Sequence, residues 1–345
     1  MSRPTLGLLW PLTAALLVLA VAAPLLTRSE AAEPALLRLT LGTGGSGGVY
    51  HEYGAALAGI SADRSEGVQI TALTTAASVE NNRLVAEGTV DAAFTLADVA
   101  ALAVAGEPPF EEPLPITAVA RLYDNHTHVV VRADSPYQDL ADLAGSAVSV
   151  GAQGSGTEMI AERLLDLVGF GEGRDRSEGR GVHRVRLSIE ASAAALERGD
   201  IDAFFWSGGL PTQAVAALAE RHPVRLLDLS RHVTALSEEY GAYFSELPVP
   251  AETYPGVPAV RTIGVPSLLV VNAAMPDADA EALTRLLFTS RTRLAEIHPV
   301  AFHLHPRSAI STLPVPLHPG AADYYQEVKS AHDRAPVASA PPRPA

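Results

Sequence analysis

One arrangement recurs along this chain and constrains its fold more than any other feature: a strand-like apolar run ends in a glycine-rich turn, and a helical pattern follows. Residues 36–42 lead through the glycines of residues 42–48 into a helical pattern at 50–60. Residues 151–157 and 207–212 repeat this arrangement later in the chain. Strands that alternate with helices of this length predict βαβ units with parallel sheets. We therefore expect an α/β fold.

The alternation continues over most of the 345 residues, a length that suggests two domains. Further strands are expected at residues 68–74, 91–96, 117–122, 128–131, 147–150, 182–189, 201–206, 224–229 and 263–271. Further helices are expected at residues 78–87, from 98 onward, and at 157–168, 191–197, 212–221 and 277–296. Glycine and proline predict loops at residues 171–181 and, in extended form, at 248–258.

The first 32 residues have the pattern of a secretory signal peptide. Arg3 precedes an almost entirely apolar run over residues 6–26, and the triplets 29–31 and 30–32 then offer small-residue cleavage sites. The run is long enough to act as an uncleaved membrane anchor instead, although Pro11 and Pro24 interrupt it. Both interpretations predict export of the rest of the chain.

Composition excludes several classes of function. The chain has no cysteine, so disulfides, cysteine nucleophiles and thiolate metal sites are ruled out. Its net charge is −14 with no basic run, which argues against nucleic-acid binding. We expect no cofactor and no metal, because His126 and His128 share a strand face without an identifiable third ligand. A solvated face is the simpler interpretation of the two histidines.

The first glycine-rich turn satisfies two sequence motifs. Gly42, Gly44 and Gly47 match the dinucleotide pattern G-x-G-x-x-G. However, the acid about 20 residues on, Asp63, precedes the second strand instead of ending it. The G-x-S-x-G pattern around Ser46 matches a hydrolase nucleophile turn. Five glycines in seven residues match such patterns easily, so each motif is weak.

A third interpretation needs only backbone chemistry. Free N–H groups at a helix N-terminus favour an anion, and glycine lets a ligand approach the backbone closely. Residues 74–78 add a hydroxyl-rich version of the same turn. Since ligands of open α/β sheets bind at the carboxyl ends of the strands, these turns predict a cleft for a small anion. The alternative is that each turn is only a helix N-cap.

Nine stretches, in order from about residue 39 to 325, carry a family resemblance. They are residues 41–50, 77–84, 87–93, 128–133, 139–145, 148–158, 199–206, 254–256 and 318–325. The chain resembles a solute-binding protein of the TAXI type, the extracytoplasmic receptor subunit of a TRAP transporter. Ala76 and Ala77 stand where such proteins often carry a glycine, so the resemblance implies a bulkier wall there.

The resemblance implies a type II-like periplasmic-binding-protein fold with a ligand cleft between two hinged lobes. The expected division is a signal peptide at 1–32, lobe 1 at 33–133 plus 259–332, lobe 2 at 134–258, and a disordered Pro/Ala-rich tail at 333–345. The implied ligand is a glutamate-like amino acid or a dicarboxylate. The implied partners are the TRAP membrane subunits, and the receptor itself would be a monomer without catalytic residues.

Twelve residues are expected to bind the ligand by this match. In lobe 1 they are Thr43, Gly45, Ser46, Tyr50, Ser78 and Asn81, and in lobe 2 they are Gly154, Ser155, Gly156, Thr157, Trp206 and Gly208. Backbone N–H and side-chain hydroxyl groups would hold a carboxylate. Tyr50 and Trp206 would cover its carbon chain, unless they are hinge or core aromatics. Asp98 would contact a ligand ammonium or, more simply, cap the next helix.

Two other classes of function compete with this one. An exported α/β hydrolase would use Ser46 as its nucleophile. A ligand-sensing module would present its bound state to a signalling partner instead of a transporter.

Overall fold

The computed structural model describes residues 36–63, 67–171 and 181–334. The described residues from Leu37 onward belong to one compact unit. The expected signal peptide, most of the expected 171–181 loop and the tail from residue 335 therefore lie outside the described residues.

The first half-sheet consists of β2, β1, β3 and β10. The strands β1 (Leu37–Gly42), β2 (Val68–Leu73) and β3 (Ala92–Leu96) are parallel, and β10 (Val260–Asn272) is antiparallel to β3. The helices α2 (Val49–Asp63), α3 (Ser78–Ala86) and α4 (Ala97–Ala105) each follow one of the parallel strands.

The second half-sheet repeats this order with β6, β5, β7 and β4. The strands β5 (Ala147–Ser149), β6 (His183–Val185) and β7 (Ala203–Gly208) are parallel, and β4 (Ile116–Arg132) is antiparallel to β7. The helices that follow the parallel strands are α5 (Gly156–Leu167), α6 (Ile189–Arg198) and α7 (Gln213–Arg221).

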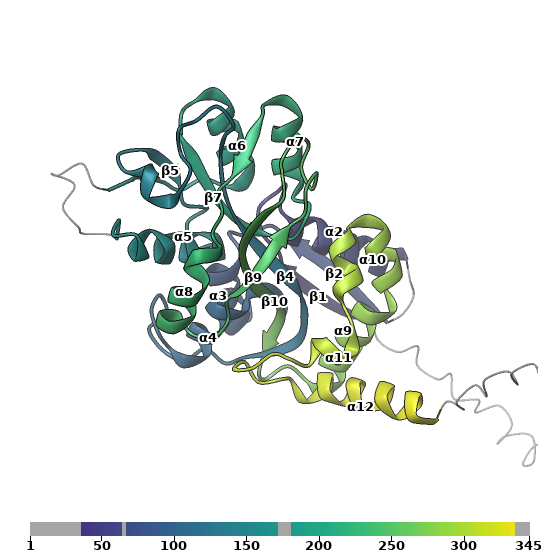
Figure 1. Ribbon diagram of the computed structural model, residues 1–345. Coiled ribbons are helices and arrows are strands. Elements are labelled where there is room, and N and C mark those ends of the chain that lie inside the picture. The colour runs from purple at the N-terminus through teal and green to yellow at the C-terminus, as the bar shows by residue number, and fades with distance from the viewer. Residues whose placement is uncertain (1–35, 64–66, 172–180, 335–345) are drawn as a thin grey trace, which may run out of the picture. The chain divides into compact units, whose positions relative to one another are not determined.

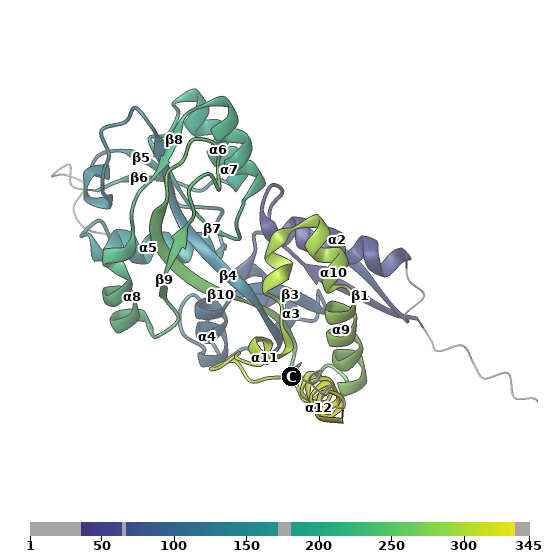
Figure 2. The same ribbon diagram turned by 45° about the vertical axis from the view of Figure 1, so that its right-hand side comes forward.

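The long strands β4 and β10 join the two half-sheets (Figures 1 and 2). The first part of β4 pairs with β10, and at His126 it exchanges that partner for β7, opposite Gly208. Two short strands lie outside this order: β8 (Val224–Leu226) pairs with β4, and β9 (Ser245–Val249) pairs with β10.

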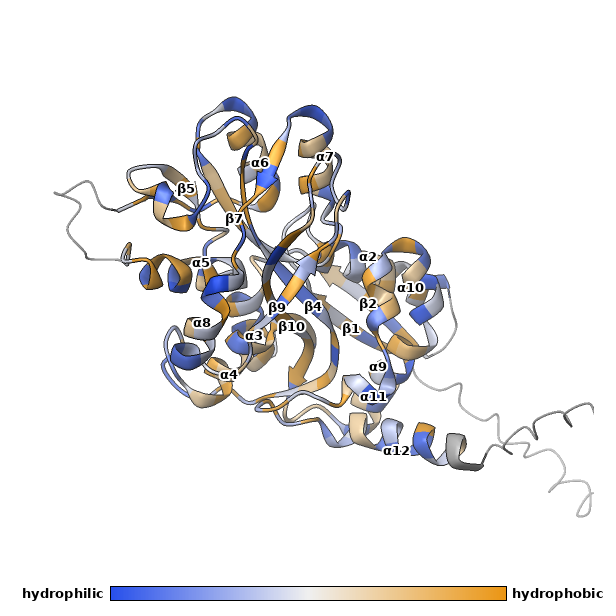
Figure 3. Ribbon diagram, in the orientation of Figure 1, coloured by the Kyte–Doolittle hydropathy of each residue, from blue (hydrophilic) through white to orange (hydrophobic). Residues whose placement is uncertain are grey.

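The remaining helices lie mostly in the C-terminal part of the chain. They are α8 (Val233–Tyr240), α9 (Asp277–Thr289), α10 (Arg291–Ile297), α11 (Pro306–Ala309) and α12 (Pro319–Arg334). Apolar residues concentrate in the strands, while most helices alternate between apolar and polar residues (Figure 3). One buried cluster joins strands of both half-sheets to α3, α4 and α5, with Val99, Val148 and Ile160 among its members.

The α/β class is confirmed, but four details of the expected pattern are wrong. The sheet is mixed rather than parallel, because β4 and β10 run against their neighbours. Residues 117–122 and 128–131 belong to one strand, since the polar residues between them keep the strand pairing. The expected helix at 277–296 is interrupted at Ser290, and the expected strand at 182–189 shrinks to three residues before Ser188 caps α6.

Candidate functional site

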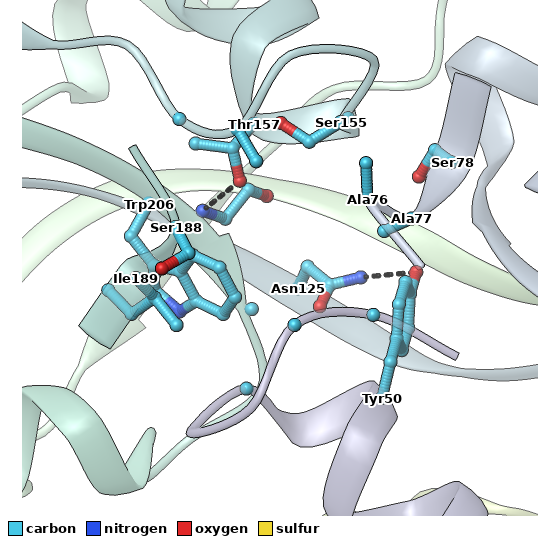
Figure 4. A pocket seen from close by; sticks show the side chains of 18 of the residues that line it. Tyr50, Ala76, Ala77, Ser78, Asn125, Ser155, Thr157, Ser188, Ile189 and Trp206 are labelled. Carbon is cyan, nitrogen blue, oxygen red and sulfur yellow. Dashed lines mark hydrogen bonds between the residues drawn. The ribbon is translucent and has the colours of Figure 1, made fainter. Parts of the chain in front are cut away.

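A small cavity lies at the carboxyl ends of β1, β5 and β7, where both half-sheets contribute to its wall (Figure 4). Its volume is about 100 Å³. Its lining residues are Gly44, Gly45, Gly48, Val49, Tyr50, Thr75, Ala76, Ala77, Ser78, Leu96, Asn125, Gly151, Ala152, Ser155, Gly156, Thr157, Leu187, Ser188, Ile189, Phe205, Trp206, Ser207 and Gly208. No side chain in this set carries a formal charge.

The N-terminal ends of three helices form part of the cavity wall. Val49 opens α2, Gly156 opens α5 and Ile189 opens α6, and all three residues line the cavity. In the turn before α2, the N–H groups of Gly44 and Gly45 donate to no acceptor within residues 36–63, 67–171 and 181–334. The helix dipoles and these N–H groups make the wall electropositive without a basic side chain.

A fourth helix, α3, uses its N-terminus differently. The N–H groups of Val79 and Glu80 both donate to the carbonyl oxygen of Gly154, at 3.1 and 3.2 Å. Gly154 belongs to the turn before α5, so this bond connects the two sides of the cavity. The same junction is tight at Gly156, where an added Cβ would lie 2.5 Å from Leu96 Cδ1 and 2.7 Å from Ser78 Oγ.

Two buried hydroxyl groups on the wall accept backbone hydrogen bonds. Ser78 Oγ accepts from the N–H of Leu96 at 3.1 Å, and Thr157 Oγ1 accepts from the N–H of Ser207 at 3.1 Å. Neither hydroxyl donates its own proton to a group in the described part of the chain. Both protons therefore remain free for a ligand.

Tyr50 and Asn125 form one side of the cavity. Tyr50 Oη lies 2.7 Å from Ser267 Oγ, and Asn125 Nδ2 donates to Tyr50 Oη at 3.4 Å. Burial raises the pKa of Tyr50 above its usual range, so the phenol is neutral. Tyr50 also stacks on Phe94 with ring centroids 5.2 Å apart, which fixes the plane of its ring.

Trp206 is held by a chain of hydrogen bonds that leads away from the cavity. Its indole N–H donates to Thr212 Oγ1 at 2.8 Å, and the N–H of Thr212 donates to Tyr254 Oη at 3.2 Å. Tyr254 Oη lies 2.9 Å from His128 Nε2. Burial lowers the pKa of His128 to about 3, so the imidazole is neutral.

The histidine pair on β4 does not form a solvated face. His128 is 1% exposed, and burial also lowers the pKa of His126. Within the residues that the structure describes, no group of three metal-ligating side chains is present.

The structure brings eight of the twelve expected residues to the cavity wall. These are Gly45, Tyr50, Ser78, Ser155, Gly156, Thr157, Trp206 and Gly208. The other four, Thr43, Ser46, Asn81 and Gly154, do not line it. Asn81 Nδ2 donates to the carbonyl oxygens of Thr43 and Phe94, so Asn81 holds the β1–α2 turn in place.

Asp98 neither lines the cavity nor caps α4, whose N-cap is Leu96. Its carboxylate pairs with the guanidinium of Arg163 in α5 instead.

Ser46 is exposed, and its hydroxyl bonds to no histidine within the described residues. The geometry therefore does not assemble a serine–histidine pair there, which a serine nucleophile needs.

The sequence patterns did not predict several of the lining residues, notably Asn125, Ser188 and Ile189. Ser188 accepts from the N–H of Ala191 as the N-cap of α6, and a serine that ends a strand-like run is a signal for such a position. Asn125 stands in the middle of a long strand and carried no comparable signal.

The two half-sheets, each with three parallel strands and one long antiparallel strand, define a fold of the periplasmic-binding-protein type. The chain belongs to the NMT1-like family, whose model matches residues 41–328. None of the helices in residues 36–63, 67–171 and 181–334 is long and apolar enough to cross a bilayer.

Solved structures with a similar fold include solute-binding proteins. The periplasmic aliphatic sulphonate binding protein SsuA from Escherichia coli is 15% identical, with a TM-score of 0.44 over 86% of each chain. The alkanesulfonate-binding protein SsuA from Xanthomonas axonopodis pv. citri is 16% identical, with a TM-score of 0.44 over 87% of this chain and 93% of its own. The substrate binding protein of an amino acid ABC transporter is 13% identical, with a TM-score of 0.43 over 77% and 98%.

Proposed function

We propose that this protein is an extracytoplasmic receptor that captures a small organic anion by closure of two lobes. The observation that carries the proposal is the meeting of three helix N-termini, from both half-sheets, around one cavity. Such N-termini favour negative charge, and the free hydroxyl protons of Ser78 and Thr157 add donors. Aliphatic and aromatic side chains, among them Leu96, Ile189 and Trp206, offer contact to a carbon skeleton.

The lobes in this proposal are residues 33–133 plus 259–332, and residues 134–258. The strand β4 therefore belongs to lobe 1 by its position in the chain, although its last part, from His126, pairs with β7 of lobe 2. The exchange of partners along β4 at His126 supports a division of the sheet into two bodies. The contact of Gly154 with Val79 and Glu80, together with the close approach of Gly156 to Leu96, would then belong to the closed state. A ligand that touches both lobes stabilises that state in proportion to its preference for it.

The closed receptor would deliver its ligand to the membrane subunits of a TRAP transporter. This step rests on the resemblance of residues 41–325 to TAXI-type receptors and on the expected export signal at 1–32. We propose accordingly that the protein acts as a periplasmic monomer.

Tryptophan fluorescence tests the proposal, because Trp206 lines the cavity and the chain has only one other tryptophan, Trp10. We expect titration with small carboxylates to change the emission of the purified protein saturably. The change should disappear in Trp206→Phe, while a calorimetric titration of that variant still detects binding. A folded protein that gives no response to any carboxylate or sulfonate in either assay contradicts the proposal. Labelling of Ser46 by a fluorophosphonate would favour the hydrolase instead.

A further inference from the structure

The cavity wall lacks any group that could neutralise a positive charge. Its 23 lining residues include no aspartate and no glutamate. The acids near it in the sequence have other partners or positions. Glu80 Oε2 accepts from the N–H of Ala76, and Glu158 Oε2 accepts from the N–H of Gly154. Glu190, which follows Ile189, is exposed and does not line the cavity.

An ammonium group in this cavity would therefore lose its water shell without gaining a counter-charge. The helix N-termini would also repel the ammonium group, because their partial charge is positive. Burial of an unpaired charge is among the most unfavourable events in a protein interior. The same features favour a carboxylate or sulfonate, whose oxygens accept from N–H and O–H groups.

The size of the cavity sets a second limit. A volume of about 100 Å³ is smaller than the roughly 150 Å³ of an engineered apolar cavity that binds benzene. By this comparison the cavity encloses about six non-hydrogen atoms of a ligand or fewer. The methyl groups of Ala76 and Ala77 occupy part of the wall that would otherwise be open to a larger molecule (Figure 4).

We infer that the ligand is a compact organic monoanion without an ammonium group, such as a short-chain monocarboxylate or alkanesulfonate. This inference rests on the proposed function and narrows it, since it excludes glutamate-like amino acids and the larger dicarboxylates. The apolar contacts from Leu96, Ile189 and Trp206 favour a short carbon chain over an inorganic anion.

Matched ligand pairs test the inference on the wild-type protein by calorimetry at pH 7.5. Acetate is compared with glycine, propionate with alanine, and ethanesulfonate with taurine, so that each pair differs by one amino group. Succinate and glutamate are added as larger anions. We expect the ammonium-free member of each pair to bind about 100-fold more tightly than its partner. Both larger anions should bind more weakly than propionate.

A substitution that adds a negative charge to the cavity wall without changing its shape is the second test. Asn125 is 1% exposed and lines the cavity, and both Tyr50 and Ser267 beside it carry hydroxyls that can donate to a carboxylate. At pH 8, Asn125→Asp should weaken propionate binding by more than about 10-fold through like-charge repulsion. Gln138→Glu adds the same charge at an exposed position beside Arg225 and should leave the affinity unchanged.

The possible outcomes distinguish a failure of the inference about the ligand from a failure of the proposed receptor function. Equal or tighter binding of alanine than propionate overturns the inference on charge, and tighter binding of succinate overturns the limit on size, while the receptor function stands in both cases. Unchanged propionate affinity in Asn125→Asp overturns the placement of the anion in this cavity. If no anion in the panel binds to the folded protein, the proposed function itself fails.

Discussion

The carboxylate of Asp98 in α4 pairs with the guanidinium of Arg163 in α5, and both side chains are almost completely buried, at 1% and 8% exposure. The guanidinium also lies 4.9 Å from the ring centroid of Tyr240. Burial raises the pKa of Asp98, and the charge of Arg163 opposes this shift. The pair connects a helix that follows β3 with one that follows β5, away from the cavity wall. It would therefore belong, like the contact of Gly154 with α3, to the closed state of the proposed lobes.

Removal of one partner of this pair should be costly. Asp98→Asn leaves the Arg163 guanidinium buried without its counter-charge, and we expect a loss of about 3–5 kcal/mol in the free energy of unfolding. The double variant Asp98→Leu/Arg163→Met should recover most of this loss, because it removes both charges. Urea denaturation measures both values. A single variant as stable as the wild type would show that the pair does not form.

The backbone at Ala77 holds a conformation that glycine adopts more readily. Its φ is 83° and its ψ is −142°, and its methyl group lies at the cavity wall. Ala77→Gly should raise the free energy of unfolding by about 1 kcal/mol, as released strain outweighs the added entropy of the unfolded chain.

Ala76→Gly is the matched control, because Ala76 lines the same wall without a positive φ. It should lower stability or leave it unchanged. Thermal melts in the absence of added anions distinguish the two variants. A less stable Ala77→Gly protein would mean that no strain is stored at this position.

Closure should depend on the absence of a side chain at Gly156. A methyl group there would meet Leu96 and Ser78 at 2.5 and 2.7 Å, but the φ of Gly156 is not positive, so α5 itself accepts alanine. We expect Gly156→Ala to keep the wild-type fold and to bind propionate at least about 10-fold more weakly. Gly59→Ala in α2, where nothing lies within 4 Å, should bind normally. Circular dichroism and calorimetry on both variants check this, and normal binding by Gly156→Ala would argue against the proposed closure.

Stability should fall in mild acid because of His128. Its folded-state pKa of about 3 lies below the unfolded value of about 6.5, so the unfolded chain binds more protons between these values. The contribution of neutral His128 to the free energy of unfolding is present above pH 6.5 and is lost as the pH falls toward 3. The free energy of unfolding should be about 2 kcal/mol lower at pH 5 than at pH 7 from this group alone.

His128→Gln provides the comparison for that prediction. The variant should be less stable than the wild type at pH 7, since Tyr254 loses its imidazole partner. Its stability should nevertheless change less between pH 7 and pH 5. Urea midpoints at several pH values measure both slopes, and parallel slopes would exclude His128 as the source.

The local pattern predicted the parts of the site that the backbone builds. The turn before α2 and the turn before α5 each follow a strand and open a helix, and eight expected residues reach one cavity because parallel strands end at the same edge. Thr43 and Asn81 have the polar character of ligand contacts, yet both are buried and bond the backbone instead. Thr43 Oγ1 donates to the carbonyl oxygen of Leu73 at the end of β2, and Asn81 Nδ2 donates to that of Thr43 in the β1–α2 turn. Sequence alone does not separate a polar residue that holds a turn from one that meets a ligand.

The features that the local sequence pattern did not predict depend on pairing between residues far apart in the chain. Residues 123–127 are mostly polar, which suggests a break between two strands, but they continue β4 because β10 and then β7 pair with them. Asn125 thereby comes to the cavity from the strand that joins the half-sheets. The partner of Asp98 was equally hidden, since Arg163 lies 65 positions away in the chain.

Small-angle X-ray scattering of the wild-type protein, with and without saturating propionate, measures whether the two lobes close on a ligand. Closure predicts a smaller radius of gyration with propionate, and no such decrease for Gly156→Ala. Trp206 fluorescence in the same samples reports whether the cavity is occupied. Identical scattering curves at a propionate concentration that saturates the fluorescence change would contradict capture by closure.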